Sequence, residues 1–169
     1  FDWARWDAEM ARSLDRYKFS AFQLPNVGLG SGTFHERSEP EIQGYPETSP
    51  VYQAAFKNYW QAVETHLRER GWLDEAYVYW FDEPDPKDYP FVMNGFRKLK
   101  DVAPGITRML TEQPEPELVG GPNLWCCLTD QFKPDKAAPR MAAGDRFWWY
   151  VCTGPKAPYA GLFIDHAGM

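Results

Sequence analysis

The chain has 169 residues, 44% of them hydrophobic and 25% charged, which is enough for one cored domain and short for two. Its net charge of −6, from 24 acidic and 18 basic residues, argues against a nucleic-acid partner, because such partners bind basic faces. No apolar run approaches the roughly 18 residues that a membrane-spanning helix needs, so we expect no such segment.

The first half of the chain predicts two helices around one strand. Apolar residues at helical spacing indicate a helix over Asp2–Tyr17, and a strand follows at Phe19–Leu24. Residues 27–50 are rich in Gly, Pro, Ser and Glu and show no periodicity, and a loop of that length usually has a function. A second apolar stripe predicts a helix over Val51–Arg70, which Gly71 ends.

A continuous apolar run comes next, Ala76–Phe81 (AYVYWF), of the kind found in strands that are buried on both faces of a parallel sheet. The run ends in two neighbouring carboxylates, Asp82 and Glu83, and then Pro84. A helix is predicted over Tyr89–Val102.

The rest of the chain continues this alternation of strands and helices. We predict strands at Ile106–Thr111, within Leu118–Leu128 and at Arg146–Cys152, a weak helix over Lys133–Ala143, and a last short strand at Gly161–Ile164. Alternating strands and helices favour right-handed βαβ units and a parallel sheet.

A complete (β/α)8 barrel needs about 250 residues and eight strands, which is more than this chain supplies. We therefore predict an α/β fold in which residues 1–169 are the middle βα units of a TIM-type barrel, with the flanking strands and domains missing. The alternative is a small, open, doubly wound sheet. Its nucleotide-binding version is disfavoured, because no helix follows the glycines of the stretch Gly28–Gly32.

Metal and cofactor chemistry have no support in the sequence. Cys126, Cys127 and Cys152 show no CxxC spacing, and the three histidines are scattered. We predict free, buried thiols, no metal site and no cofactor, and the oligomeric state stays open.

The strand end at Asp82 and Glu83 is the strongest candidate for catalysis, because the working residues of parallel α/β folds lie at the carboxyl ends of strands. Two neighbouring carboxylates repel each other, which favours retention of one proton, as a general acid requires. Pro84 biases Glu83 toward an extended backbone. Adjacent strand side chains face opposite ways, so both reach one pocket only if the strand breaks into a loop there, which Pro84 also favours. The structural alternative is that Asp82 caps a helix and Glu83 is solvated.

The run AYVYWFDEPDPKDYP, with Gly71-Trp72-Leu73 before it, resembles the catalytic domain of glycoside hydrolase family 123. Further matching segments follow in order: Pro104-Gly105, Asn123-Leu124-Trp125, WWYVCTGPKAPY and Phe163-Ile164-Asp165. The resemblance covers nearly the whole chain and implies that residues 1–169 are a partial glycosidase barrel domain. One departure is Asn123, where the family usually has Asp.

The resemblance implies a retaining β-N-acetylgalactosaminidase with substrate-assisted catalysis and a glycan as its partner. Carried over, Asp82 orients the 2-acetamido group while its carbonyl oxygen attacks the anomeric carbon. Glu83 protonates the leaving oxygen and later takes a proton from water as the oxazolinium intermediate opens. The family also implies a secreted, periplasmic or cell-surface location in a bacterium.

The remaining candidates for substrate binding lie near strand ends: Gln23, Asn26, Thr111, Trp125, Trp149 and Tyr150. The three aromatic residues would form walls around the sugar, with core packing as the alternative for each. Gln23 and Asn26 would hydrogen-bond sugar hydroxyls, although a turn role suits Asn26 better.

Two other functions stay open. The first is a two-carboxylate retaining glycosidase, with Glu83 as acid/base and Glu112, or a carboxylate beyond the end of the chain, as nucleophile. The second is a non-catalytic carbohydrate-binding relative. The intact pair of Asp82 and Glu83 argues against it, because a decayed site has no reason to keep two repelling carboxylates.

Overall fold

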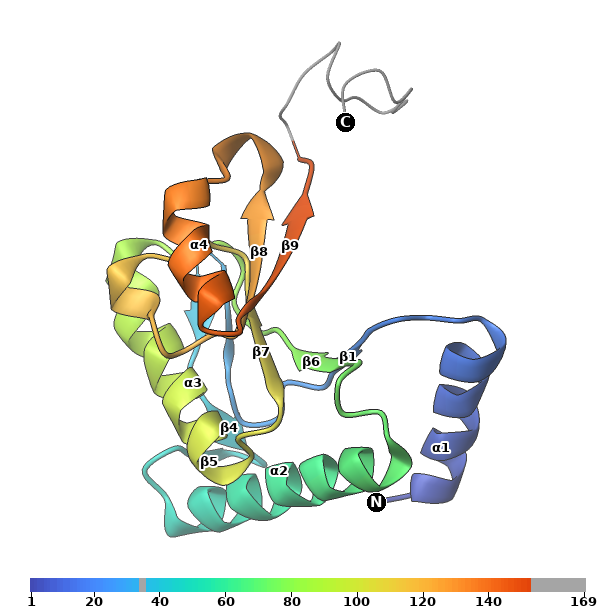
Figure 1. Ribbon diagram of the computed structural model, residues 1–169. Helices are drawn as coiled ribbons and strands as arrows, with labels where there is room; N and C mark the ends of the chain where they lie inside the picture. The colour runs from blue at the N-terminus through green and yellow to red at the C-terminus, as the bar shows by residue number, and fades with distance from the viewer. Residues whose placement is uncertain (34–35, 153–169) are drawn as a thin grey trace.

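Five parallel strands form the centre of the protein in the computed structural model, which describes residues 1–33 and 36–152 (Figure 1). The strands lie side by side in chain order: β1 (Phe22–Leu24), β6 (Ala76–Val78), β7 (Thr107–Leu110), β8 (Leu124–Leu128) and β9 (Arg146–Tyr150). Every pairing between neighbours is parallel, so the five carboxyl ends lie at one edge of the sheet.

Three helices lie on the outer side of this curved sheet: α2 (Pro50–Arg70), α3 (Tyr89–Val102) and α4 (Pro134–Ala142) (Figure 1). The ends of α2 follow from its sequence. The Ser49 side chain accepts a hydrogen bond from the backbone of Val51, Pro50 occupies the first turn, and Gly71 ends the helix with a left-handed φ of 73°. Its buried residues recur every three or four positions and face the sheet: Tyr52, Phe56, Trp60, Val63 and Leu67.

The N-terminal helix α1 (Trp3–Ala11) continues as a π-helical turn (Arg12–Arg16) and packs beside α2. Trp3 stacks on His66 with 3.9 Å between ring centroids, and the Asp7 carboxylate lies 2.6 Å from the His66 ring. Trp6 contacts Trp72 just beyond the end of α2. These contacts fix α1 at the β1 end of the sheet.

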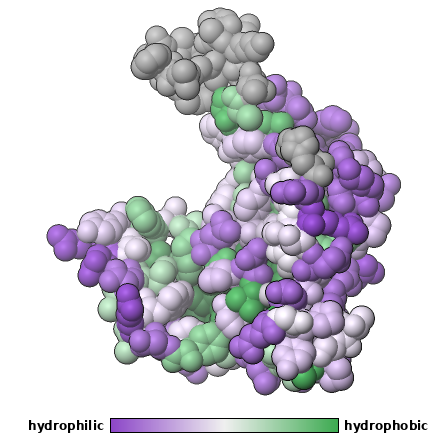
Figure 2. Space-filling view, turned by 180° about the vertical axis from the view of Figure 1, so that it is seen from behind, coloured by the Kyte–Doolittle hydropathy of each residue, from purple (hydrophilic) through white to green (hydrophobic). Residues whose placement is uncertain are grey.

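The sheet has one face packed against helices and one face that is not. Side chains such as Val78, Leu110 and Trp125 join the main core with residues of α2 and α3. The alternate side chains form a second cluster on the opposite face, in which Tyr77 packs edge-on against Trp148. Among the described residues, this second cluster contains only side chains of the sheet and its strand ends. Figure 2 shows the molecule from behind as a hollowed body, with hydrophobic surface inside the hollow.

The long segment after β1 forms two small antiparallel hairpins, β2 (Ser31–Gly32) with β3 (Arg37–Ser38) and β4 (Glu41–Ile42) with β5 (Tyr45–Pro46). Helix side chains hold it in place. The Trp60 indole donates to the Val27 carbonyl at 3.0 Å, and the Tyr52 hydroxyl donates to the Gly28 carbonyl. The Lys98 ammonium group also donates to Gly28, at 3.1 Å. These hydrogen bonds anchor the start of the predicted loop to the helices.

The parallel α/β sheet and its principal helices are confirmed as predicted, and the errors concern boundaries. The predicted first helix is α-helical only to Ala11, and the first strand is shorter than expected. The region from Leu118 is not strand from its start, because Pro116–Leu118 forms a 3-10 turn (η3) and Gly120 turns the chain with a φ of 90°. Two further 3-10 turns are η2 (Pro86–Asp88) and η4 (Thr129–Gln131).

Other sequence predictions have mixed outcomes. Cys126 and Cys127 are free and buried as predicted, but Cys152 is exposed, because it lies beyond the end of β9. The predicted strand at Gly161–Ile164 lies outside the described residues. Within residues 1–33 and 36–152, none of the helices combines the length and the apolar character that membrane spanning requires.

Candidate active site

The backbone after β6 is held by the loop that follows β1. Gly32 pairs with Phe81 in parallel, and its amide donates to the Trp80 carbonyl at 3.1 Å. The Asp82 amide in turn donates to the Gly32 carbonyl at 2.8 Å. A Cβ atom at Gly32 would lie 2.2 Å from the Phe81 ring, so only glycine allows this approach. The loop therefore fixes the position at which the first carboxylate leaves the sheet.

The Asp82 carboxylate accepts two hydrogen bonds, one from a side chain at the end of its own strand β6 and one from a side chain at the end of β7. The Tyr79 hydroxyl donates to Oδ1 at 2.5 Å and the Thr111 hydroxyl at 3.2 Å. Burial, and then the hydrogen bond to Asp82, raises the pKa of the Tyr79 phenol, so that it remains a protonated donor. Two fixed donors on one oxygen leave the carboxylate little freedom to rotate.

Glu83 adopts a left-handed backbone conformation, with a φ of 43°. For a residue with a side chain this costs roughly 1–2 kcal/mol, and such strain is found at functional sites. The Glu83 amide donates to the Thr111 hydroxyl oxygen at 2.8 Å, which holds the conformation. The strand therefore breaks at Glu83. The extended backbone that Pro84 predicts for Glu83 is wrong, because the hydrogen bond to Thr111 holds a left-handed conformation instead.

Both carboxylates consequently contact tyrosines of the second cluster, on the face of the sheet that the helices leave open. The Tyr150 hydroxyl, at the end of β9, donates to Glu83 Oε1. Burial, followed by this hydrogen bond, raises the pKa of the Tyr150 phenol. Asp82 has Tyr79 as its phenol partner and Glu83 has Tyr150, while Thr111 contacts both residues. Each carboxylate therefore has a partner of its own.

A pocket of about 340 Å³ opens beside Glu83 at the carboxyl ends of the strands. Its walls include Thr111, Glu112 and Tyr150, together with Tyr89 from the start of α3. Its volume and its convergent polar groups are typical of a small-molecule site.

Glu112 is the second acidic residue of this pocket. Its carboxylate accepts from the Gln113 amide at 2.7 Å and is hydrogen-bonded to the Tyr89 phenol. Burial is the largest cause of a raised pKa at Glu112, and the nearby carboxylates Glu115 and Glu83 raise it further. Glu112 therefore favours its protonated form more strongly than an exposed glutamate does.

The structure brings Thr111 and Tyr150 to the carboxylates but not the other predicted binding residues. Trp125 is 0% exposed, lies in the main core and donates its indole N–H to Asp145 at 2.8 Å. Trp149 is 58% exposed and does not line the pocket. It follows Trp148 on β9, so its side chain takes the opposite face of the strand.

The two polar residues at the end of β1 make structural hydrogen bonds. The Gln23 amide donates to the Tyr79 carbonyl at 3.0 Å and links β1 to the end of β6. The Asn26 amide donates to the Gly30 carbonyl at 3.0 Å, which is the turn role. At the opposite, amino-terminal edge of the sheet, Asn123 Oδ1 accepts from the Arg108 amide at 2.7 Å. The contact made by Asn123 is thus structural.

Two residues of the site were missed in the sequence analysis. Tyr79 was assigned only to a buried strand, although strand alternation places it on the same face as Tyr77. Tyr89 was taken as the first residue of a helix, yet its hydroxyl reaches Glu112. In both cases the signal was a hydroxyl-bearing aromatic residue within a few positions of Asp82 and Glu83 in the sequence.

Comparison with known proteins supports the resemblance seen in the sequence. Residues 10–168 match the family model for the catalytic domain of glycoside hydrolase 123. The chain belongs to glycoside hydrolase family 123. The predicted resemblance is therefore confirmed, and it places the chain in a class of glycosidases.

One similar solved structure is a family 123 glycoside hydrolase from Clostridium perfringens, described in connection with glycolipid glycan hydrolysis. The identity is 15% and the TM-score is 0.46. The alignment covers 73% of this chain and 22% of that protein, so this family 123 chain spans less than a quarter of its length. No curated protein matches the chain. Within residues 1–33 and 36–152, no group of three or more His, Cys, Asp or Glu side chains is arranged to hold a metal ion.

Replacing Thr111 with Val is expected to impair both carboxylates at once, because the Thr111 hydroxyl contacts Asp82 and the Glu83 amide. The unpaired amide should lower the free energy of unfolding by about 1–3 kcal/mol. We expect kcat to fall about tenfold, which corresponds to roughly 1.4 kcal/mol, with little change in KM. Steady-state kinetics and thermal unfolding measure the two effects. Thr111→Ser keeps the hydroxyl and is the matched control; an equal loss in both variants would assign the effect to packing.

Replacing Glu112 with Gln is expected to raise the thermal stability of the protein at pH 7.5 and to change it little at pH 4. Because the folded-state pKa of Glu112 is raised, its contribution to stability is greatest below its ordinary pKa and is lost as the pH rises through the folded-state value. Gln is neutral and retains an acceptor for the Gln113 amide. Melting temperatures across this pH range test the expectation. A variant that is less stable than the wild type at pH 7.5 would contradict it.

Proposed function

We propose that this chain carries the catalytic carboxylates of a retaining β-N-acetylgalactosaminidase that uses the 2-acetamido group of its substrate as the nucleophile. The observation that supports this is that two adjacent carboxylates at one strand end are held by different partners. Asp82 is fixed by Tyr79 and Thr111, and Glu83 lines the pocket with Tyr150 beside it. The proposed specificity for galactosamine is what the resemblance to the family implies.

In the first proposed step, Asp82 accepts a hydrogen bond from the acetamido N–H and orients the carbonyl oxygen toward the anomeric carbon. The C–O bond to the leaving group breaks as the acetamido oxygen bonds to that carbon, and an oxazolinium ion forms. Glu83 gives its proton to the leaving oxygen. The negative charge of Asp82 stabilises the positive charge that develops on the ring nitrogen.

In the second step, water attacks the anomeric carbon from the side that the leaving group vacated. Glu83, now ionised, takes a proton from this water, and the acetamido group re-forms. Two inversions give net retention of configuration, and no enzyme carboxylate bonds to the sugar. A single rigid pair is therefore enough, whereas the two-carboxylate scheme places its carboxyl groups about 5 Å apart across the sugar.

We also propose that the sheet is part of a closed (β/α)8 barrel. In a doubly wound sheet the strand order reverses at a switch point, with helices on both faces. Here the order β1-β6-β7-β8-β9 follows the chain without reversal. The side chains of α2 and α3 join the core on one face of the sheet only. Both features are typical of a barrel wall, in which the second face lines the barrel interior.

The alternative with Glu112 as an enzyme nucleophile has one observation in its favour, because Glu112 lines the same pocket as Glu83. Its raised pKa argues against the role. A nucleophilic carboxylate must be ionised, and burial favours the neutral form of Glu112.

The test compares hydrolysis of an aryl β-N-acetylgalactosaminide and an aryl β-galactoside by the intact protein. Participation of the acetamido group predicts cleavage of the first substrate alone. Cleavage of both with similar kcat would indicate an enzyme nucleophile, and Glu112→Gln would then abolish it. Failure to cleave either would leave the carbohydrate-binding alternative. An aryl β-N-acetylglucosaminide reports the preference for galactosamine over glucosamine.

A further inference from the structure

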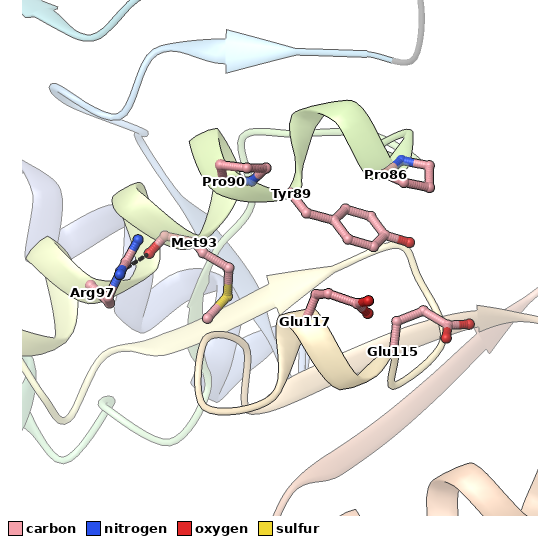
Figure 3. A pocket seen from close by; sticks show the side chains of 7 residues that line it. All are labelled: Pro86, Tyr89, Pro90, Met93, Arg97, Glu115 and Glu117. Carbon is pink, nitrogen blue, oxygen red and sulfur yellow. Dashed lines mark hydrogen bonds between the residues drawn. The ribbon is translucent and has the colours of Figure 1, made fainter.

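A second cavity, of about 620 Å³, adjoins the pocket that contains Glu83. It lies between the first turns of α3 and the turn η3 (Figure 3). The two cavities share Pro86 and Tyr89 as wall residues, so they are neighbours along one surface. The mechanism proposed above uses only the smaller of them.

The wall of the second cavity combines apolar surfaces with unpaired hydrogen-bonding groups. Pro86, Pro90 and Met93 supply the apolar part. Arg97 uses its Nε–H on the Met93 carbonyl at 3.1 Å, and the rest of its guanidinium group has no protein partner among the described residues. The Glu117 carboxylate likewise has no hydrogen-bond or ion-pair partner in the part of the chain that the structure describes. Figure 3 shows Glu117 directed toward the Tyr89 ring.

These groups suit a sugar. Its C–H faces pack on proline, methionine and tyrosine side chains, and its hydroxyls both donate and accept hydrogen bonds. Glu115, the other acidic wall residue, is paired with Lys136 at 2.5 Å. Arg97 and Glu117 then contribute one charge of each sign, which favours an uncharged ligand over an acidic one.

The position of the cavity relative to the two carboxylates indicates which part of the glycan it would bind. The smaller pocket is lined by Glu83 and not by Asp82. In the proposed mechanism Glu83 faces the leaving oxygen, whereas Asp82 faces the acetamido group of the sugar that is cleaved off. A surface that continues from Glu83 over Pro86 and Tyr89 therefore begins at the leaving-group end.

We propose that the cavity between α3 and η3 binds a neutral sugar of the leaving group, with Arg97 and Glu117 as its hydrogen-bonding residues. This inference rests on the proposed function. It assigns Arg97 and Glu117 to recognition of the glycan and gives them no part in bond cleavage.

The test measures kcat/KM of the intact wild-type protein, Arg97→Ala and Glu117→Gln on two substrates. One is an aryl β-N-acetylgalactosaminide, which has no second sugar, and the other is the disaccharide N-acetylgalactosaminyl-β-galactose. For each variant we expect kcat/KM on the disaccharide to fall about tenfold, the effect of one hydrogen bond to a charged group. The aryl substrate should change less than about twofold, because its leaving group has no sugar hydroxyls for Arg97 and Glu117 to hydrogen-bond. Lys100→Ala removes a cation from the same helix without altering either cavity, and it should match the wild type on both substrates.

The outcomes separate this inference from the proposed function. Equal losses on both substrates, or no loss on either, would overturn the leaving-group site. Hydrolysis of the aryl substrate by the wild-type protein would still support the proposed function. A wild-type protein that cleaves neither substrate would overturn both. The preference for an uncharged ligand has its own readout: a disaccharide that ends in galacturonic acid should be a poorer substrate than the galactose form. Equal rates would contradict that preference.

Discussion

Replacing Glu83 with Gln is expected to lower kcat on N-acetylgalactosaminyl-β-galactose by about 10²–10⁴-fold, the usual contribution of a general acid. Gln has nearly the same shape and retains an acceptor for the Tyr150 hydroxyl, but it has no acidic proton for the leaving oxygen. KM should change little, because proton transfer to the leaving oxygen occurs only in the transition state.

The leaving group decides whether the lost function is proton donation. A dinitrophenolate departs without protonation, so the first step on that aryl substrate should be far less affected by Glu83→Gln. Steady-state kinetics on both substrates measure the difference. Glu69→Gln, an equivalent change on the exposed side of α2, is the control and should leave both rates unaltered. An unchanged rate on the disaccharide would refute the assignment of Glu83.

Replacing Asp82 with Asn is expected to lower kcat about 10²–10³-fold on every N-acetylgalactosaminide, including those with activated leaving groups. The amide has no charge to stabilise the oxazolinium ion. Its NH₂ group also meets the Tyr79 and Thr111 hydroxyls, which donate to the aspartate. The defect lies in the formation of the ring, so a better leaving group does not remove it.

The two variants are therefore expected to differ in how strongly kcat depends on the leaving group, and this difference is what the experiment measures. Slopes of log kcat against the pKa of the released phenol should be steeper for Glu83→Gln than for the wild type, and unchanged for Asp82→Asn. Asp101→Asn on the exposed end of α3 is the control for loss of one negative charge. If activated leaving groups restored the rate of Asp82→Asn, the proposed acetamido role would be wrong.

The sequence was sufficient for those parts of the fold that depend on local pattern. Ala76–Phe81 is continuously apolar, and its core segment is a central strand of the sheet. The stripe of α2 and the Gly71 that ends it lie within one segment, and the predicted start of the helix differs from the observed one by one residue. The carboxylates at the strand end followed from the same local reasoning, because parallel strands bring their carboxyl ends together.

Features that depend on distant partners were not predictable. Trp125 and Tyr150 both occupy strands, but one faces the helices and the other faces Glu83. The sequence alone does not give the register that decides between these faces. Residues 27–50 show no periodicity, and nothing in the sequence of this segment indicates that Gly32 pairs with Phe81, far along the chain. The role of Tyr79 was missed for a related reason, because it depends on the approach of Thr111, from another strand, to Asp82.

The left-handed backbone of Glu83 has a consequence for directed evolution of this domain. A glycine at position 83 would adopt the same conformation without strain, so heat-based screening of random variants should enrich it. Such survivors would be more heat-tolerant and would have lost the proposed proton donor. Screens for thermal tolerance therefore need a parallel activity assay for variants at position 83. Gly32 does not need one, because the Phe81 ring leaves no room for a side chain there.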